Sequence, residues 1–111
     1  MVRHQDIRQG DIWLVRFDPT VGSEIQKTRP AMVVSPAVMN DHLNTAIVAP
    51  LTSGSRPAGF RVPVRFDSKD GLVVLDHIRS VDKRRLVRKL GSASPETLLR
   101  TLAVMRDIFN T

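Results

Sequence analysis

Arg29 stands at the start of an apolar stretch, directly before Pro30. Because a residue that precedes proline is driven into extended backbone geometry, the direction of the Arg29 side chain is restricted. A guanidinium held in this way can grip a phosphate through two parallel hydrogen bonds. The alternative is a structural ion pair between Arg29 and Glu24 or another acidic side chain, and the residue types alone favour this alternative.

Two hydroxyl side chains, Thr52 and Ser53, follow Ala49-Pro50-Leu51, where a predicted strand opens into a loop. Hydroxyl groups at such a position can donate hydrogen bonds to phosphate oxygens. They also commonly bond to the main chain of their own turn. The sequence leaves both roles open for this pair.

A third polar segment contains Asp76, His77 and Arg79, and a basic run follows it. In a regular strand, His77 and Arg79 would share one face and Asp76 would lie on the other. A titratable imidazole beside a fixed cation suits the cleavage of RNA, and an ordinary surface strand is the alternative. Five of the seven residues from 83 to 89 are lysine or arginine, which is typical either of a solvated turn or short helix or of a strip that binds RNA.

Other catalytic arrangements are missing from the sequence. No cluster of His, Cys, Asp and Glu has the spacing of a zinc site, no glycine-rich phosphate loop occurs, and no Gly-x-Ser-x-Gly turn carries a nucleophile. The chain has no cysteine, which excludes disulfides and thiolate metal sites and favours a reducing compartment. We therefore expect neither a metal nor another cofactor.

The charge of the chain narrows the class of partner. Lys and Arg total 17 against 11 Asp and Glu, which gives a formal net charge of +6. Such a surplus attracts polyanions, so nucleic acid is the leading candidate and an acidic protein the second. Aromatic residues make up only 5% of the chain, which weakens any model of bases stacked on a sheet. With no signal peptide and no apolar run of roughly 18 residues, we expect a cytoplasmic protein without a membrane segment.

Short apolar segments must position these residues, and we take all 111 residues, 1–111, as a single domain. Strands are predicted over 8–17, 31–35, 45–51, 60–66 and 72–81. Polar loops are predicted over 21–29 and 52–57, with a short helical turn over 36–42. Apolar and polar residues alternate from Phe60 to Phe66, as in a half-buried strand, and Pro63 on the polar face favours a sheet edge or a bulge. Asp70-Gly71 predicts a hairpin turn before the last strand.

The end of the chain changes to a helical period. Ser94 suits the N-cap, Pro95 the first turn and Glu96 the positive end of the helix dipole. Short strands followed by one terminal helix predict a mainly β (α+β) fold, in which a mostly antiparallel barrel or strongly curled sheet carries one stripe of the helix. The apolar residues that recur at three- and four-residue spacing are Leu98, Leu99, Leu102, Met105, Ile108 and Phe109.

In their order along almost the whole chain, several segments resemble the MazF/PemK family of toxins. They are Gly10-Asp11-Ile12-Trp13-Leu14-Val15, Phe17-Asp18-Pro19-Thr20, Gly22-Ser23-Glu24, Arg29-Pro30, Pro50-Leu51-Thr52-Ser53, Ala58-Gly59-Phe60, and Asp76 to Asp82 with Arg84-Arg85. The resemblance implies a CcdB/PemK-type SH3-like barrel that works as a homodimer. It implies sequence-selective, metal-independent cleavage of single-stranded RNA, mainly messenger RNA. The usual partner of such a toxin is a small antitoxin with an acidic, flexible tail.

The resemblance also implies roles for particular residues. Arg29 and Thr52 would be essential, and Glu24 would be the loop glutamate of the site. Many similar chains carry glutamine where this one has His77, so the histidine either transfers a proton or hydrogen-bonds a base. The other residues that we expect to contact RNA are Ser23, Lys27, Thr28, Ser53, Arg56, Asp76, Arg79, Lys83 and Arg85.

Cleavage of RNA without a metal usually proceeds by attack of the 2′-hydroxyl on the adjacent phosphorus, which leaves a 2′,3′-cyclic phosphate and a 5′-hydroxyl. Arg29 suits the charge of the phosphorane; it is an awkward base because arginine rarely loses its proton, although the resemblance places it at the proton-transfer step. Thr52 would donate to a nonbridging oxygen. Glu24 would act as the base or hold Arg29 in place.

Three other functions fit parts of the pattern. A gyrase-inhibiting toxin of the CcdB type could share the fold without needing Arg29 and Thr52 around a phosphate. A non-catalytic SH3-like module would bind nucleic acid through charge alone, without cutting it. A degenerate family member kept for regulation is the third alternative, against which the intact Arg29 and Thr52 argue.

Overall fold

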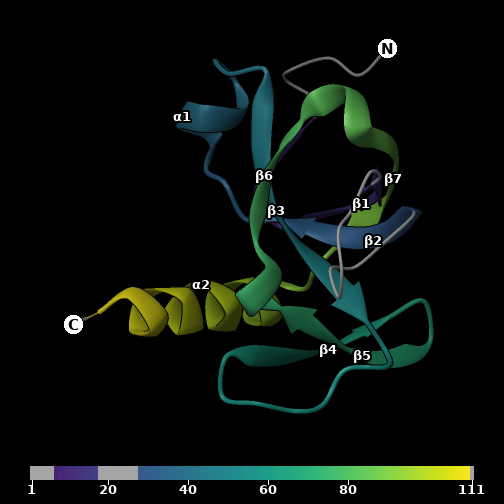
Figure 1. Cartoon of the computed structure of the whole chain (residues 1–111), viewed down its shortest axis with the longest axis vertical. Coiled ribbons are helices and arrows are strands. Elements are labelled where there is room, and N and C mark those ends of the chain that lie inside the picture. Colours follow the sequence, from purple (N-terminus) through teal and green to yellow (C-terminus); the bar gives the residue numbers. More distant parts are fainter. Residues whose placement is uncertain (1–6, 18–27, 111) are drawn as a thin grey trace.

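The computed structural model describes residues 7–17 and 28–110, and Figure 1 shows their arrangement. The elements in chain order are β1 (Asp11–Arg16), β2 (Thr28–Val33), α1 (Ala37–Asn40), β3 (Thr45–Thr52), β4 (Arg61–Phe66), β5 (Lys69–Val74), the 3₁₀ turn η2 (Leu75–His77), β6 (Arg79–Asp82), the 3₁₀ turn η3 (Lys83–Arg85), β7 (Leu86–Ser92) and α2 (Pro95–Phe109). The prediction of a mainly antiparallel β fold with a terminal helix is confirmed.

The sheet is organised around β3. The strand order is β4-β5-β3-β2-β1-β7, with β6 also paired to β3, and every pairing is antiparallel. One side of β3 pairs with β2. Along the other side, Thr45–Val48 pair with β6, whereas Leu51 and Thr52 pair with β5. This change of partner lets the sheet curl, and η2 lies where the chain passes from β5 to β6.

Both faces of the curled sheet are covered by apolar side chains. Alternate residues of β1 enter two different apolar clusters. Trp13 and Val15 lie in the first cluster, and Ile12 lies in the second cluster. The same alternation occurs in β2, where Val33 belongs to the first cluster and Met32 to the second. A strand buried on both faces reads as a continuous apolar run, which explains why β1 and β2 lack a polar face in the sequence.

Helix α2 closes one side of the second cluster. Ser94 caps it by accepting a hydrogen bond from the Thr97 amide at 3.1 Å, and Pro95 occupies the first turn as predicted. The helix packs against β4, and Figure 1 shows it (yellow) beside that strand. The side chains that contact the core are those of Leu98, Val104 and Met105. Leu99, Ile108 and Phe109, which were expected in the packed stripe, are exposed.

The second strand begins earlier than predicted. Thr28 and Arg29, expected in a loop, belong to β2 because they pair with Arg16 and Val15 of β1. Pro30 is therefore the third residue of β2. Pairing of β2 with β3 starts only at the next residue, so the missing N–H of this proline does not interrupt that ladder.

The prediction of one strand over 72–81 is wrong. The chain forms β5, then the turn η2, then β6, because β5 and β6 pair with different parts of β3. The hairpin turn is also misplaced in the prediction: it lies at Asp67 and Ser68, which have φ of 54° and 61°, and Asp70-Gly71 lies inside β5. A pair of residues with positive φ is typical of a tight hairpin, and aspartate tolerates that geometry better than most residues.

The basic run was not recognised as a strand. Leu86–Ser92 forms β7, which pairs with β1 through two register shifts. Its Val87, Arg88 and Lys89 are exposed, so the apolar alternation is weak. In the part of the chain that the structure describes, no helix is long and apolar enough to cross a membrane.

Candidate active site

Pairing of β2 with β3 brings Arg29 and Thr52 together. The register sets Ala31 opposite Pro50 and Met32 opposite Ala49. Arg29 lies two residues before Ala31 and Thr52 two residues after Pro50, so both side chains lie just beyond the end of this ladder, where a continued register would place them opposite each other. Both residues line one depression of about 410 Å³. Residues 23 positions apart in the sequence thus share one site.

The depression joins a polar rim to apolar walls. Ser53 lines it next to Thr52, and Asp67, Lys69 and Asp70 of the β4–β5 hairpin contribute its far side. Arg29 itself is exposed. A hollow with an exposed guanidinium and neighbouring hydroxyls suits a phosphate group better than an apolar ligand. The apolar residues that line it are Pro30, Leu51, Val64, Phe66 and Leu90.

The Thr52 hydroxyl has a defined orientation. Its oxygen accepts a hydrogen bond from the Gly54 amide at 3.1 Å. A hydroxyl that accepts in this way keeps its hydrogen available to donate to another group. The two roles that the sequence left open for Thr52 are therefore compatible, because the bond to its own turn aims the hydroxyl and leaves its proton for a ligand.

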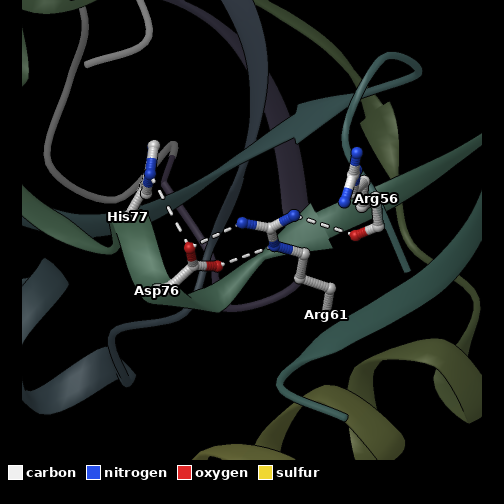
Figure 2. Close-up of polar contacts among 4 residues, drawn as sticks. All are labelled: Arg56, Arg61, Asp76 and His77. Atoms are coloured by element: carbon white, nitrogen blue, oxygen red, sulfur yellow. Dashed lines mark hydrogen bonds and ion pairs between the residues drawn. The ribbon is translucent and has the colours of Figure 1, made fainter. Parts of the chain in front are cut away.

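A second polar cluster surrounds Asp76 (Figure 2). The Arg61 guanidinium donates from Nε to Asp76 Oδ1 at 3.0 Å and from Nη2 to Oδ2 at 2.9 Å. Its Nη1 donates to the carbonyl oxygen of Arg56 at 2.8 Å. His77 Nε2 lies 3.7 Å from Asp76 Oδ2. The hydrogen bonds from Arg61 hold the pKa of Asp76 below its usual value, although partial burial opposes this, and they raise the pKa of Arg61.

Asp76 and His77 do not lie as a regular strand would place them. They belong to η2, and neither is among the residues that line the depression of Arg29 and Thr52. The His77 side chain is 36% exposed. Arg61 is the polar residue that sequence reasoning missed. The alternation of Phe60 to Phe66 places it on the polar face of a strand, but no sequence signal pairs it with an acid 15 residues away.

Phe60 also departs from the prediction. The alternation places it on the buried face with Val62 and Val64, yet it precedes the strand and is 42% exposed. The Arg61 guanidinium carbon lies 5.6 Å from the centre of its ring. An arginine at this distance from an aromatic face is attracted to it.

The other residues expected at RNA are dispersed. Thr28 is exposed at the start of β2, and Arg56 is exposed in the β3–β4 loop. The Arg79 guanidinium carbon lies 5.8 Å from the centre of the Phe17 ring. Arg85 Nη1 donates to the carbonyl of Arg16 at 3.2 Å. The predictions for Ser23, Glu24 and Lys27 concern residues outside the described part of the chain.

Lys83 has a different environment from the one expected. The residue is buried, and its ammonium donates to the carbonyl oxygen of Asn40. Burial lowers the pKa of Lys83, and the charge of Asp41 opposes this shift. Because a buried, hydrogen-bonded ammonium is not presented to a polyanion, this arrangement does not support a direct contact between Lys83 and RNA.

Within 7–17 and 28–110, no three His, Cys, Asp or Glu side chains lie close enough together to hold a metal ion.

Comparison with known proteins places this curled sheet in a class of small β-rich toxins. Residues 8–109 match the model of the PemK-like, MazF-like toxins of type II toxin–antitoxin systems, so the chain belongs to this family. It is 40% identical to the endoribonuclease toxin ChpB of Escherichia coli K12, over 95% of this chain and 99% of that protein. It is 38% identical to the endoribonuclease PemK of E. coli, over 87% of this chain and 77% of that protein.

Solved structures agree with this assignment. MazF from Deinococcus radiodurans matches with a TM-score of 0.82 and 28% identity, over 95% of this chain and 97% of that one. A MazE–MazF structure from the same organism matches with a TM-score of 0.78 and 27% identity, over the same shares of the two chains. The curled sheet with its terminal helix is therefore the MazF-like fold.

Proposed function

We propose that this endoribonuclease toxin cleaves single-stranded RNA at selected sequences, and that the depression of Arg29 and Thr52 holds the phosphate that is cut. The observation that carries the proposal is the convergence of these two side chains on one hollow from neighbouring strands. An exposed guanidinium and a hydroxyl with a free proton are two donors for the same anion.

The cleaving step follows from these groups. The 2′-hydroxyl loses its proton and attacks the adjacent phosphorus, the bond to the 5′ oxygen breaks, and the departing oxygen takes up a proton from solvent, so the products are a 2′,3′-cyclic phosphate and a 5′-hydroxyl. Arg29 stabilises the added negative charge of the phosphorane, and Thr52 donates to a nonbridging oxygen. A positioned donor of this kind is worth about 10²–10³-fold in rate. Glu24, outside the described residues, takes the 2′ proton or holds Arg29.

His77 is better suited to reading a base than to moving the proton. It lies outside the lining of the depression, and its ring is partly exposed beside Asp76. A partly exposed imidazole offers both a donor and an acceptor to the edge of an unpaired base. We assign further contacts with the RNA to Ser23, Lys27, Thr28, Ser53, Arg56, Arg79 and Arg85.

Partners and location follow from the same proposal. The related MazF of D. radiodurans has been solved together with MazE. A net charge of +6 suits a cognate antitoxin with an acidic tail, which would compete with RNA for the same basic surface. We also propose a homodimer, as in the resemblance, and a cytoplasmic location, where messenger RNA is found.

The experiment that tests this function uses the purified chain, a long single-stranded RNA and an excess of EDTA. Arg29→Ala is the matched control, and the fragment ends are mapped chemically. We expect cuts at a short recurring motif, cyclic phosphates at the new 3′ ends, and no cuts with the variant. A deoxyribose at the cut position should block cleavage, because it removes the attacking hydroxyl.

Three outcomes would contradict parts of the proposed function. Intact RNA with a folded wild-type protein would contradict the ribonuclease function and favour a gyrase inhibitor or a simple binding module. Cleavage at the deoxyribose position would contradict attack by the 2′-hydroxyl. Cleavage that disappears in EDTA and returns with a divalent cation would contradict metal independence.

A further inference from the structure

We propose that Arg61 is a positioning residue that sets the sequence selectivity of cleavage. It would do so by fixing the β3–β4 loop, residues 53–60, to the turn η2 that carries His77. The inference rests on the proposed function, since selectivity has meaning only if the protein cuts RNA. It concerns which RNA sequences are accepted and leaves the cleaving step to Arg29 and Thr52.

One guanidinium joins three segments of the chain. Arg61 belongs to β4, Asp76 to η2 and Arg56 to the loop between β3 and β4. Figure 2 shows the planar group lying between the Asp76 carboxylate and the Arg56 carbonyl, with all three nitrogens used. Only a forked, rigid side chain can make these three bonds at once, which makes arginine the suited residue type here.

The setting of this pair differs from that of an ordinary surface ion pair. The side chains of Arg61 and Asp76 are 19% and 30% exposed. Arg65 and Asp70 form a second pair in the same hairpin, also at 2.9 Å, but their side chains are 67% and 84% exposed and they join only adjacent strands. Well-exposed pairs contribute little to structure, so Arg65 is a matched control.

The joined segments flank the proposed site. The loop begins directly after Thr52, and η2 follows β5, the strand that pairs with Thr52. The loop carries the exposed Arg56, and η2 carries the partly exposed His77. If Arg61 holds these two segments in one arrangement, the nucleotides beside the cut phosphate meet a fixed set of groups. Rigid placement of recognition groups is what separates a preferred ligand from its competitors.

The pairing also changes the role of Asp76. Both of its carboxylate oxygens accept from Arg61, and its negative charge is compensated next to a surface that must receive phosphates. The expected contact of Asp76 with RNA is thereby reinterpreted: Asp76 fixes Arg61 and the start of the His77 turn. His77 and Arg56 remain to face the RNA.

The test compares wild type with Arg61→Lys, Arg61→Gln and the control Arg65→Lys, which makes the same change as Arg61→Lys and keeps a cation beside Asp70. Each protein is given a long single-stranded RNA, and all cut sites are sequenced. kcat and KM are measured on a short RNA with the preferred motif and on one with a non-preferred sequence. Deuterium uptake of the peptide that covers residues 53–60 is measured on the same samples without RNA.

We expect both Arg61 variants to cut at more varied sites. On the preferred RNA, kcat/KM should fall by roughly 10-fold, mainly through KM, while the non-preferred RNA keeps its rate. Deuterium uptake of the loop should be faster, and Arg65→Lys should match wild type in every measurement. Lysine keeps the charge but loses the fork, so Arg61→Lys should resemble Arg61→Gln.

Three results would overturn the inference. A wild-type cut profile in Arg61→Lys would show that charge alone matters. An equal loss of kcat/KM on both RNAs would show a general structural role, and unchanged deuterium uptake would show that the loop is not fixed by Arg61. Intact RNA with the wild-type protein would instead overturn the proposed function, which separates the two failures.

Discussion

A Cβ at Gly71 would stand 3.0 Å from the carbonyl oxygen of Thr52. Gly71 is in β5, and its neighbour Leu72 pairs with Thr52 at the end of β3. The atom approached is part of the main chain, so it cannot rotate aside as the end of a flexible side chain can. Glycine at this position therefore sets how closely β5 approaches the strand end that carries the Thr52 hydroxyl.

We expect Gly71→Ala to move Thr52 by a few tenths of an ångström and to lower kcat/KM on RNA. A misplacement of about 1 Å can cost about 10²-fold, so a loss of roughly 10-fold is expected for this smaller shift. Gly59→Ala is the control, because no atom lies within 4 Å of a Cβ placed there. Equal activities of the two variants would contradict the role assigned to Gly71.

Two replacements of Thr52 distinguish the contribution of its hydroxyl from the contribution of its volume. Thr52→Val keeps the volume but removes the group that accepts from Gly54 and donates to the phosphate. We expect kcat to fall by about 10²–10³-fold in Thr52→Val, whereas Thr52→Ser keeps most of the activity. Single-turnover cleavage of a short RNA measures this difference. A valine variant with nearly wild-type kcat would exclude the hydroxyl from the cleaving step.

The pair of Arg61 and Asp76 predicts an acid-sensitive contribution to stability. The folded pKa of Asp76 is below its ordinary value of 3.8, mainly because Arg61 donates hydrogen bonds to the carboxylate. A carboxyl whose pKa is lowered on folding contributes stability that is fully present above its unfolded pKa and is lost as the pH falls through the folded pKa.

The free energy of unfolding should therefore fall more steeply with acid in the wild type than in Asp76→Asn as the pH approaches and passes below the ordinary carboxyl pKa of 3.8. At neutral pH the free energies of unfolding of wild type and Asp76→Asn should change with pH to the same extent. The reason is that the wild-type Asp76 carboxylate is then fully ionised in both the folded and the unfolded state. Urea unfolding over a series of pH values measures both slopes. Identical slopes below the ordinary carboxyl pKa would contradict the prediction.

Lys83 is expected to stabilise the fold and not to bind RNA. Its ammonium satisfies the Asn40 carbonyl in a buried setting, so Lys83→Met should lower the free energy of unfolding by about 1–3 kcal/mol. The salt dependence of RNA binding should stay unchanged. For comparison, loss of one phosphate contact in Arg79→Gln should reduce the slope of log K against log salt by about 0.7. A reduced slope with full stability in Lys83→Met would restore it as an RNA contact.

Sequence reasoning was accurate where a local signal exists. Ser94 and Pro95 mark the start of α2 because capping depends on neighbouring residues alone. The alternation around Val62 and Val64 identifies β4, and Pro63 correctly places it at a sheet edge. The errors lie where distant strands decide the structure. β5 and β6 read as one strand until each pairs with its own part of β3, and β7 is defined only by its pairing with β1.

The candidate site also has features that the sequence predicts and features that only the tertiary structure decides. The residue types of Arg29 and Thr52, their place at strand ends and the positive charge are properties of the sequence, and the family resemblance turns them into a predicted site for a phosphate chain. Their meeting in one depression depends on the register of β2 and β3. The pairing of Arg61 with Asp76 and the burial of Lys83 likewise arise from contacts between distant segments. Periodicity and residue type act over a few positions, whereas strand register and burial depend on the packing of the whole chain.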